Sequence, residues 1–157
     1  MATFKLSIDE FDEVNYELIA IHTSLEDYHL AYFINQNFPV LLSRNPNEVQ
    51  VQTREGETAF SRYTFEHHEN GICWDLLQNK SETVASAAGD LFFGASQQIS
   101  AIAYLLPEFK KVDYFLKISI SDSNPGQVLE KLGGINNITT VYPIDIDRVK
   151  SKNNLIF

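Results

Sequence analysis

Residues 112–143 read VDYFLKISISDSNPGQVLEKLGGINNITTVYP, and this stretch decides the class of fold. Apolar and polar side chains alternate over residues 112–120, which predicts a strand. Asn124 precedes a proline and is expected to cap a helix that ends at the glycine pair 133–134. The run NITTVYP at 137–143 predicts a closing strand, so the whole stretch predicts a β-α-β unit.

A second β-α-β unit is predicted closer to the N-terminus. Tyr16–Thr23 reads YELIAIHT, which is short and almost continuously apolar, as in a central strand buried on both faces. Ser24 is expected to cap a helix over residues 25–37, with Asp27 completing an approximate capping box. The run PVLLSR at 39–44 then predicts the next strand, with the helix crossing over on the usual right-handed path.

The middle of the chain carries a hairpin signal. The runs AFSRYTFEH (59–67) and ICWDLLQN (72–79) flank Asn70-Gly71, and Asn-Gly between two strand-like runs favours a tight hairpin turn. Residues 45–58 are polar and contain turn residues, so we predict a connecting segment there.

The remaining segments are less regular. Residues 80–97 are mostly small and polar, and we predict a long loop with one helical turn around Val84. Residues 98–106 resume the strand pattern, and FKLSI at 4–8 predicts a short strand. Apolar residues 155–157 follow a polar stretch at the end of the sequence, which predicts docking on the protein's own core or on a neighbouring subunit.

Two β-α-β units with strands between them predict an α+β fold. We expect a mostly antiparallel sheet with two helices on one face, ferredoxin-like with an inserted hairpin. The 157 residues suit a single domain over 1–157, long enough to bury a core without disulfides or a structural metal.

Composition and charge exclude several classes of function. Twelve Lys and Arg against 21 Asp and Glu give a net charge of −9, which argues against binding bulk nucleic acid or an anionic membrane. No apolar run approaches the roughly 20 residues of a membrane span, and we expect no signal peptide. The single cysteine, Cys73, lies beside Trp74 in an apolar run, and both are expected in the core. These features favour a cytoplasmic protein.

The sequence lacks the common catalytic signatures, including a phosphate loop, a nucleophile elbow and a cysteine pair for zinc. Residues 66–69 read EHHE, but alternate side chains of a strand point to opposite faces, so the four are not expected to converge on a metal. We therefore predict neither a metal site nor a cofactor.

His22 and Ser24 stand where the first predicted strand passes into the first helix. Backbone N–H groups and the helix dipole make such a junction suitable for an anion or a carboxylate ligand. A histidine whose hydrogen bonds are satisfied within the fold is the favoured interpretation of His22, and ligand binding and catalysis are the alternatives.

The turn after residue 106 is rich in charged residues. Glu108 and Asp113 are expected to accept backbone N–H bonds and to lock this turn, while Lys110 and Lys111 stay in water. Tyr114 shares its strand face with apolar residues and is expected to pack inward. Recognition of a partner by Glu108, Asp113 and Tyr114 is the alternative role.

The same turn carries a resemblance to a known family. Leu106-Pro107-Glu108, three residues, and then Val112-Asp113-Tyr114 resemble the motif of the IPExxxVDY family, small bacterial proteins of the Bacteroidetes type, with leucine in place of the isoleucine. The runs IAIHTSLEDYHLAYFIN, YFLKI and KSKNNLIF are similar to other family features. The resemblance implies no activity, cofactor or substrate, because the family is named for its motif alone.

The function predicted from the sequence is that of a non-enzymatic binding or regulatory module for a small ligand or a protein partner, expected as a homodimer. His22, Ser24, Glu108, Asp113 and Tyr114 are the candidate binding residues. One alternative is a structural or assembly subunit. The other is an enzyme with a site around His22.

Overall fold

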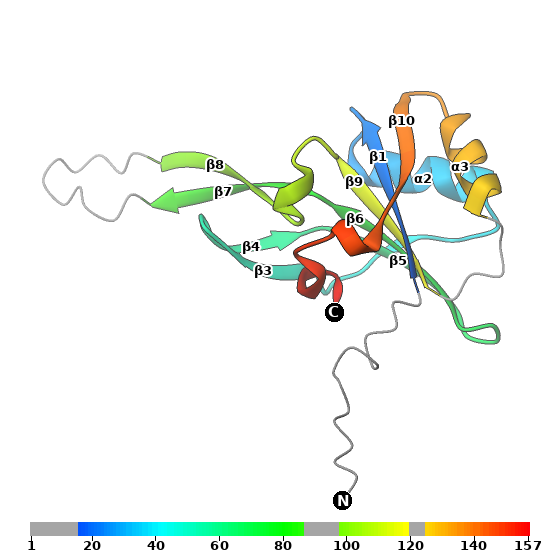
Figure 1. The fold of residues 1–157 in the computed structure, drawn as a ribbon, viewed down its shortest axis with the longest axis horizontal. Coiled ribbons are helices and arrows are strands. Elements are labelled where there is room, and N and C mark those ends of the chain that lie inside the picture. Colours follow the sequence, from blue (N-terminus) through cyan, green and yellow to red (C-terminus); the bar gives the residue numbers. More distant parts are fainter. Residues whose placement is uncertain (1–15, 87–97, 120–124) are drawn as a thin grey trace, which may run out of the picture.

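The computed structural model describes residues 16–86, 98–119 and 125–157, arranged around a central sheet with two α-helices (Figure 1). The strands and α-helices are, in chain order, β1 (Tyr16–Thr23), α2 (Asp27–Asn37), β2 (Ser43–Arg44), β3 (Val49–Thr53), β4 (Gly56–Phe60), β5 (Arg62–His67), β6 (Ile72–Gln78), β7 (Lys80–Ser86), β8 (Gln98–Tyr104), β9 (Tyr114–Ser119), α3 (Pro125–Gly133) and β10 (Ile138–Ile144). Short 3-10 helices are η1 (Pro107–Phe109), η2 (Ile146–Arg148) and η3 (Lys152–Leu155).

The central sheet has the strand order β10-β1-β9-β6-β5-β2, and every neighbouring pair in it is antiparallel. Two further antiparallel pairs, β3 with β4 and β7 with β8, stand beside it. The predicted α+β class with a mostly antiparallel sheet and two helices is therefore confirmed.

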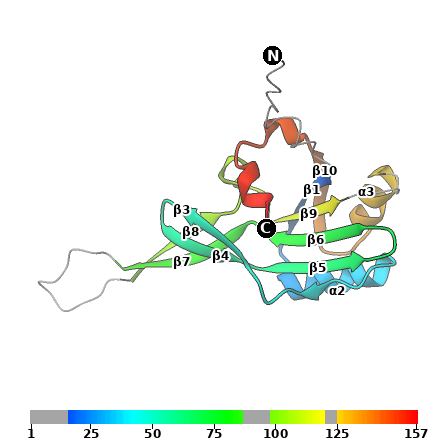
Figure 2. The same cartoon turned by 90° about the horizontal axis from the view of Figure 1, so that it is seen from below.

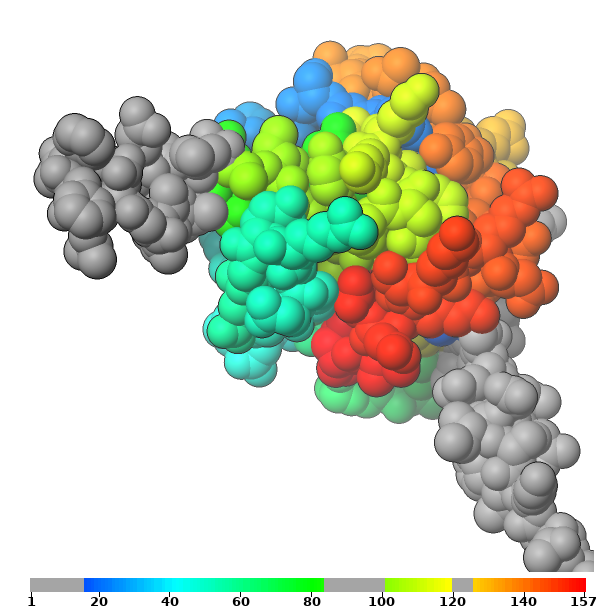
Figure 3. All heavy atoms as spheres, turned by 60° about the vertical axis from the view of Figure 1, so that its left-hand side comes forward, coloured from blue at the N-terminus to red at the C-terminus, as the bar shows by residue number. Residues whose placement is uncertain are grey.

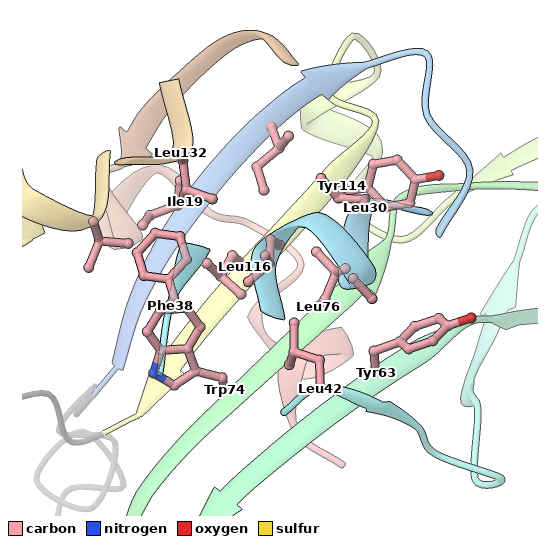
Figure 4. Packing of buried hydrophobic residues seen from close by; sticks show 14 of the residues in the cluster. Ile19, Leu30, Phe38, Leu42, Tyr63, Trp74, Leu76, Tyr114, Leu116 and Leu132 are labelled. Atoms are coloured by element: carbon pink, nitrogen blue, oxygen red, sulfur yellow. The ribbon is translucent and has the colours of Figure 1, made fainter. Parts of the chain in front are cut away.

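Both faces of the central sheet are buried, which explains why YELIAIHT is almost continuously apolar. On one face, Ile19 and Ile21 of β1 join a cluster with Leu116 of β9 and with buried residues of both helices (Figure 4). On the other face, Leu18 and Phe115 join a second cluster with residues of β3, β4, β8 and the C-terminal segment. Viewed from below, α2 lies on one side of β5 and β6 and the C-terminal turns lie on the other (Figure 2). Successive residues of β1 thus enter different clusters, as the two-residue period of a strand requires.

The predicted hairpin is confirmed. β5 and β6 pair from Arg62–Leu77 to His67–Ile72, and Gly71 at the turn adopts a φ of 67°. A positive φ is easily accessible to glycine, which fits the Asn-Gly signal. Trp74 is 5% exposed, as predicted, and its ring centroid lies 5.2 Å from that of Phe38.

The prediction for residues 45–58 was incomplete. The structure forms a second hairpin there, β3 with β4, in which Val49 and Val51 are buried while Gln50 and Gln52 are exposed. Gly56 has a φ of 117° at the turn. The alternation in VQVQT was the available signal, and the surrounding turn residues concealed it.

The predicted loop over 80–97 was wrong for its first part. Lys80–Ser86 forms β7, which pairs along its length with β8, so no helical turn forms around Val84. β8 matches the strand predicted over 98–106 but joins this ribbon rather than the central sheet. Pairing with a distant strand overrides the weak local preference of small polar residues. Residues 87–97 lie outside the described residues.

The first helix begins later than predicted. Glu26, not Ser24, is the N-cap residue of α2, and no side chain caps it. The hydroxyl of Thr23 instead accepts the N–H of Leu25 at 3.1 Å. The strand predicted at 39–44 shrinks to the two residues of β2, because the amide of Asn35 bonds both the N–H and the carbonyl of Leu42.

Two predictions lie outside the described residues, namely the strand at 4–8 and the helix cap at Asn124. No helix among the residues that the structure describes is long and apolar enough to span a membrane.

The C-terminal segment docks on the protein's own sheet, one of the two outcomes predicted for it. Leu155 is fully buried in the second cluster, and its carbonyl accepts a hydrogen bond from Nζ of Lys117 at 2.8 Å. The ring of Phe157 lies 4.2 Å from the guanidinium carbon of Arg62 and 4.7 Å from Nζ of Lys117. Figure 3 shows this segment in red against the neighbouring elements of the body.

We predict that Trp74→Ala lowers the free energy of unfolding by about 3–5 kcal/mol, because it leaves a large cavity beneath Phe38. Urea denaturation of the variant and the wild type measures the difference. The matched control is Leu41→Ala, since Leu41 is 71% exposed. Unchanged stability of Trp74→Ala would contradict the packing described here.

Candidate functional site

A pocket lies where β1 passes into α2, with a cavity volume of about 320 Å³. Its lining comes from the β1–α2 junction, the end of β6, the start of β7 and the start of β9: Thr23, Ser24, Leu25, Glu26, Gln78, Lys80, Asp113 and Tyr114. Three of the five residues predicted for a binding site, Ser24, Asp113 and Tyr114, thus line one cavity.

Asp113, one of the residues that line this pocket, joins two segments of the chain. One carboxylate oxygen accepts the N–H of Thr23 at 2.9 Å, and the other accepts a hydrogen bond from Nζ of Lys80 at 3.0 Å. Its backbone N–H donates to the carbonyl of Ile21, and its carbonyl accepts the N–H of Asn79. Asp113 therefore accepts a backbone N–H as expected, but it fastens β1 and β7 rather than its own turn.

Lys80 supplies the positive charge of the pocket. Its side chain is 38% exposed and that of Asp113 is 27% exposed, so the ion pair faces the cavity and remains accessible to water. An ammonium group has three N–H donors, and the bond to Asp113 uses one of them. The exposed carboxylate of Glu26 and the exposed Ser24 line the same cavity.

Tyr114 also lines the pocket. As predicted from its strand face, Tyr114 is buried, in the cluster that contains Ile19 and Ile21, and its hydroxyl donates to the carbonyl of Leu25 at 2.8 Å. Burial raises the pKa of the Tyr114 phenol, and the carboxylates of Asp27 and Asp113 raise it further. The phenol is therefore neutral, and it holds the β1–α2 junction rather than acting as a base.

The sequence interpretation missed Asn79, which organises the turn below the pocket. Asn79 is fully buried, and its amide donates to the carbonyls of Phe109 at 2.9 Å and Val112 at 2.7 Å and accepts the N–H of Leu106 at 2.9 Å. Its backbone carbonyl also accepts the N–H of Leu105. The only signal was a polar residue between two strand-like runs, which by itself is typical of any connection.

His22 does not reach this pocket. The strand alternation turns it to the face opposite Thr23, where its Nε2 lies 2.9 Å from the hydroxyl of Tyr142 and the two rings are 5.4 Å apart. The structure thus gives His22 a partner within the fold and separates it from Ser24 and Asp113.

Glu108 also lies outside the pocket, and it fastens the C-terminal segment. Its carboxylate accepts the N–H groups of Lys150 and Ser151 at 3.0 and 2.9 Å and the hydroxyl of Ser151 at 2.9 Å. Burial by itself would raise the pKa of Glu108, but these donors outweigh it and hold the pKa below its ordinary value. The expected lock on the turn is instead a lock on a distant segment.

Neither the EHHE residues at 66–69 nor Cys73 belongs to this pocket. The EHHE residues lie at the tip of the β5–β6 hairpin, and no metal-binding group of three or more ligands occurs within the described ranges. Cys73 is only partly buried, contrary to the core position predicted for it, because it is the second residue of β6 and lies next to the β5–β6 turn. Burial and the neighbouring carboxylate of Asp75 raise the pKa of its thiol to about 12, so thiolate chemistry is disfavoured at neutral pH.

The pocket therefore presents charges of both signs around one small cavity. Lys80 and the amide of Gln78 supply N–H donors, and the carboxylate of Glu26 supplies an acceptor. The carboxylate of Asp113 and the hydroxyl of Tyr114, which could act as an acid or a base, are hydrogen-bonded to backbone groups of Thr23 and Leu25. Such an arrangement is suited to binding a polar molecule by complementary charges.

Comparison with known proteins adds no assignment. No protein-family model matches the chain. No curated protein matches it either.

We predict that Asp113→Ala and Glu108→Ala each lower the free energy of unfolding by about 1.5–3 kcal/mol, because the carboxylate of Asp113 accepts two hydrogen bonds and that of Glu108 accepts three. Lys110→Ala and Lys111→Ala are the matched controls and should change stability by less than about 0.5 kcal/mol. Denaturant melts of the four variants and the wild type measure these differences in the free energy of unfolding. If both acidic variants kept wild-type stability, recognition of a partner would become the primary role of these carboxylates.

The lowered pKa of Glu108 predicts a pH dependence. A carboxyl group with a depressed pKa contributes stability above its unfolded pKa of about 4.3 and loses that contribution as pH falls through the lower folded value. We expect the stability difference between wild type and Glu108→Gln to be constant near neutral pH and to shrink below about pH 4.3. Urea melts of both proteins over this range measure it, and a difference that grows in acid would contradict the described contacts.

Proposed function

We propose that this protein is a non-enzymatic binding domain whose pocket at the β1–α2 junction takes a small zwitterionic molecule of the free amino acid type. The observation that carries the proposal is the presence of Lys80 and Glu26 on the walls of a single cavity. A ligand with both a carboxylate and an ammonium group could pair its carboxylate with Lys80, beside Asp113, and its ammonium with Glu26.

The anionic group of the ligand would meet Lys80. The ammonium group of Lys80 is held at 3.0 Å from Asp113, so the position of this ammonium is defined before a ligand arrives. The remaining N–H donors of Lys80, with the side-chain amide of Gln78, can bond a carboxylate. The neighbouring Asp113 disfavours a ligand with several negative charges, because like charges repel in a partly buried site.

The cationic group of the ligand would meet Glu26. Glu26 is exposed, and it ends the β1–α2 connection that Asp113 and Tyr114 hold in place. A rigid junction lowers the conformational entropy lost on binding, which is why a structural lock next to the site supports a binding role.

We also propose a ferredoxin-like topology for the elements β1, α2, β6, β9, α3 and β10. The order β10-β1-β9-β6, with β1 antiparallel to both of its neighbours, supports this arrangement. The buried residues of α2 and α3 belong to one cluster, which supports helices on a single face. The other strands would be insertions into this core.

Membership of the IPExxxVDY family, a cytoplasmic location and a homodimer are part of the same proposal. The residues and the spacing of the motif support the family. The net charge of −9 disfavours binding to bulk nucleic acid.

Titration with the free amino acids, followed by isothermal calorimetry and amide NMR shifts, tests the proposal. We expect at least one amino acid to shift the signals of residues around Thr23, Lys80 and Asp113. Its N-acetyl derivative lacks the cation and its carboxamide lacks the anion, so both should bind at least about tenfold more weakly. Equal binding of all three compounds, or no shift with any amino acid, would overturn the assignment.

A charge-matched pair of variants provides the control. Lys80→Met should weaken binding at least about tenfold, because it removes the ammonium that meets the ligand carboxylate. Lys150→Met removes an exposed positive charge outside the pocket and should leave binding unchanged. If both variants lost affinity equally, the effect would come from net charge and not from this site.

A further inference from the structure

A second cavity, of about 240 Å³, lies at the opposite end of β1. β10 pairs with β1 only as far as Leu18 opposite Ile144, and Asp145 then leads the chain into η2. Tyr16 and Glu17 keep β9 as a neighbour on one side, while no strand among the described residues pairs with them on the other. The departure of β10 therefore creates an opening beside the start of β1.

The walls of this cavity are almost entirely apolar. Leu129 of α3, Ile144 of β10 and Ile146 of η2 face it together with the aliphatic residues of β1. Glu17 is the one residue with a charged side chain among the described lining residues. A carboxylate in such surroundings is unusual, because charged groups are seldom buried without a partner.

Glu17 has an unmet hydrogen-bonding requirement. Its Oε2 atom is buried and has no hydrogen-bond partner in the described parts of the chain. Lys117 does not meet the requirement, since it pairs with Leu18 and lies on the opposite face of the sheet, where it bonds Leu155. A buried acceptor without a donor is costly, and such a group in a folded protein calls for a specific explanation.

We infer that this cavity binds a primary amine with a compact apolar body, whose ammonium group donates to Glu17. The cavity is several times larger than the roughly 30 Å³ that one water molecule occupies, and its apolar walls offer a water few partners. A neutral apolar ligand would fill the space but leave Oε2 without a donor. An organic ammonium ion meets both conditions, because its charge faces Glu17 and its body packs against Leu129, Ile144 and Ile146.

An NMR titration of the full-length protein with cyclohexylammonium chloride tests the inference, with cyclohexanol as the neutral probe of the same shape. We expect the amine to shift the amide signals of residues 16–19 and the methyl signals of Leu129, Ile144 and Ile146. Cyclohexanol should bind at least about tenfold more weakly, because it lacks the charge. Equal binding of the two probes, or no shift with the amine, would overturn the inference.

Substitutions on two sides of the cavity sharpen the test. Glu17→Gln should weaken amine binding at least about tenfold, while Glu57→Gln, an equal charge change at an exposed position of β4, should leave it unchanged. Leu129→Lys would supply an ammonium from α3 within the cavity, and it should abolish amine binding and raise the melting temperature. Amine binding that survives Glu17→Gln or Leu129→Lys would exclude this site. These shifts involve residues different from those around Lys80, so the two proposed sites fail or succeed separately.

Discussion

The buried amide of Asn79 is the interaction on which the rest of the structure depends. Asn79 connects β6 to β7, and its side chain and backbone bond Leu105, Leu106, Phe109 and Val112 across one turn. Without these bonds the N–H groups of Leu105 and Leu106 and the carbonyl of Val112 would be left without the partner described here, and a buried group left unpaired costs about 1–3 kcal/mol. The turn from 105 to 113 therefore has one conformation, set by a residue more than twenty positions earlier.

The rigid turn determines where three segments meet. Glu108 on one side of it holds the segment at Lys150 and Ser151, while Asp113 at its end holds Thr23 of β1 and Lys80 of β7. In both cases a carboxylate accepts hydrogen bonds from backbone N–H groups. Both cavities lie along β1, one at each end, so the strand that is buried on both faces also positions the two candidate ligand sites.

Part of the candidate site was predictable from local pattern. Ser24 was placed at a strand-to-helix junction, and Tyr114 was placed inward from its strand alternation, and both line the pocket. Lys80 and Gln78 were not predicted, because nothing near them in the sequence brings them to the β1–α2 junction. Their place follows from the antiparallel pairing of β6 with β9, a contact between residues distant in the chain. His22 shows the converse, since adjacency to Ser24 in sequence did not place the two side chains in one site.

The sequence by itself determined the α+β class, the β5–β6 hairpin, the two helices and the inward face of β9, because each depends on side-chain periodicity or turn chemistry within a few residues. Tertiary structure alone decided that 80–86 is a strand, that β10 leaves β1 at Leu18, and that Glu108 bonds a segment some forty residues away. Small polar residues carry weak local preferences, so their conformation follows from the strand they pair with. A carboxylate bonds whichever buried N–H group the packed fold brings to it, and no local pattern encodes which group that is.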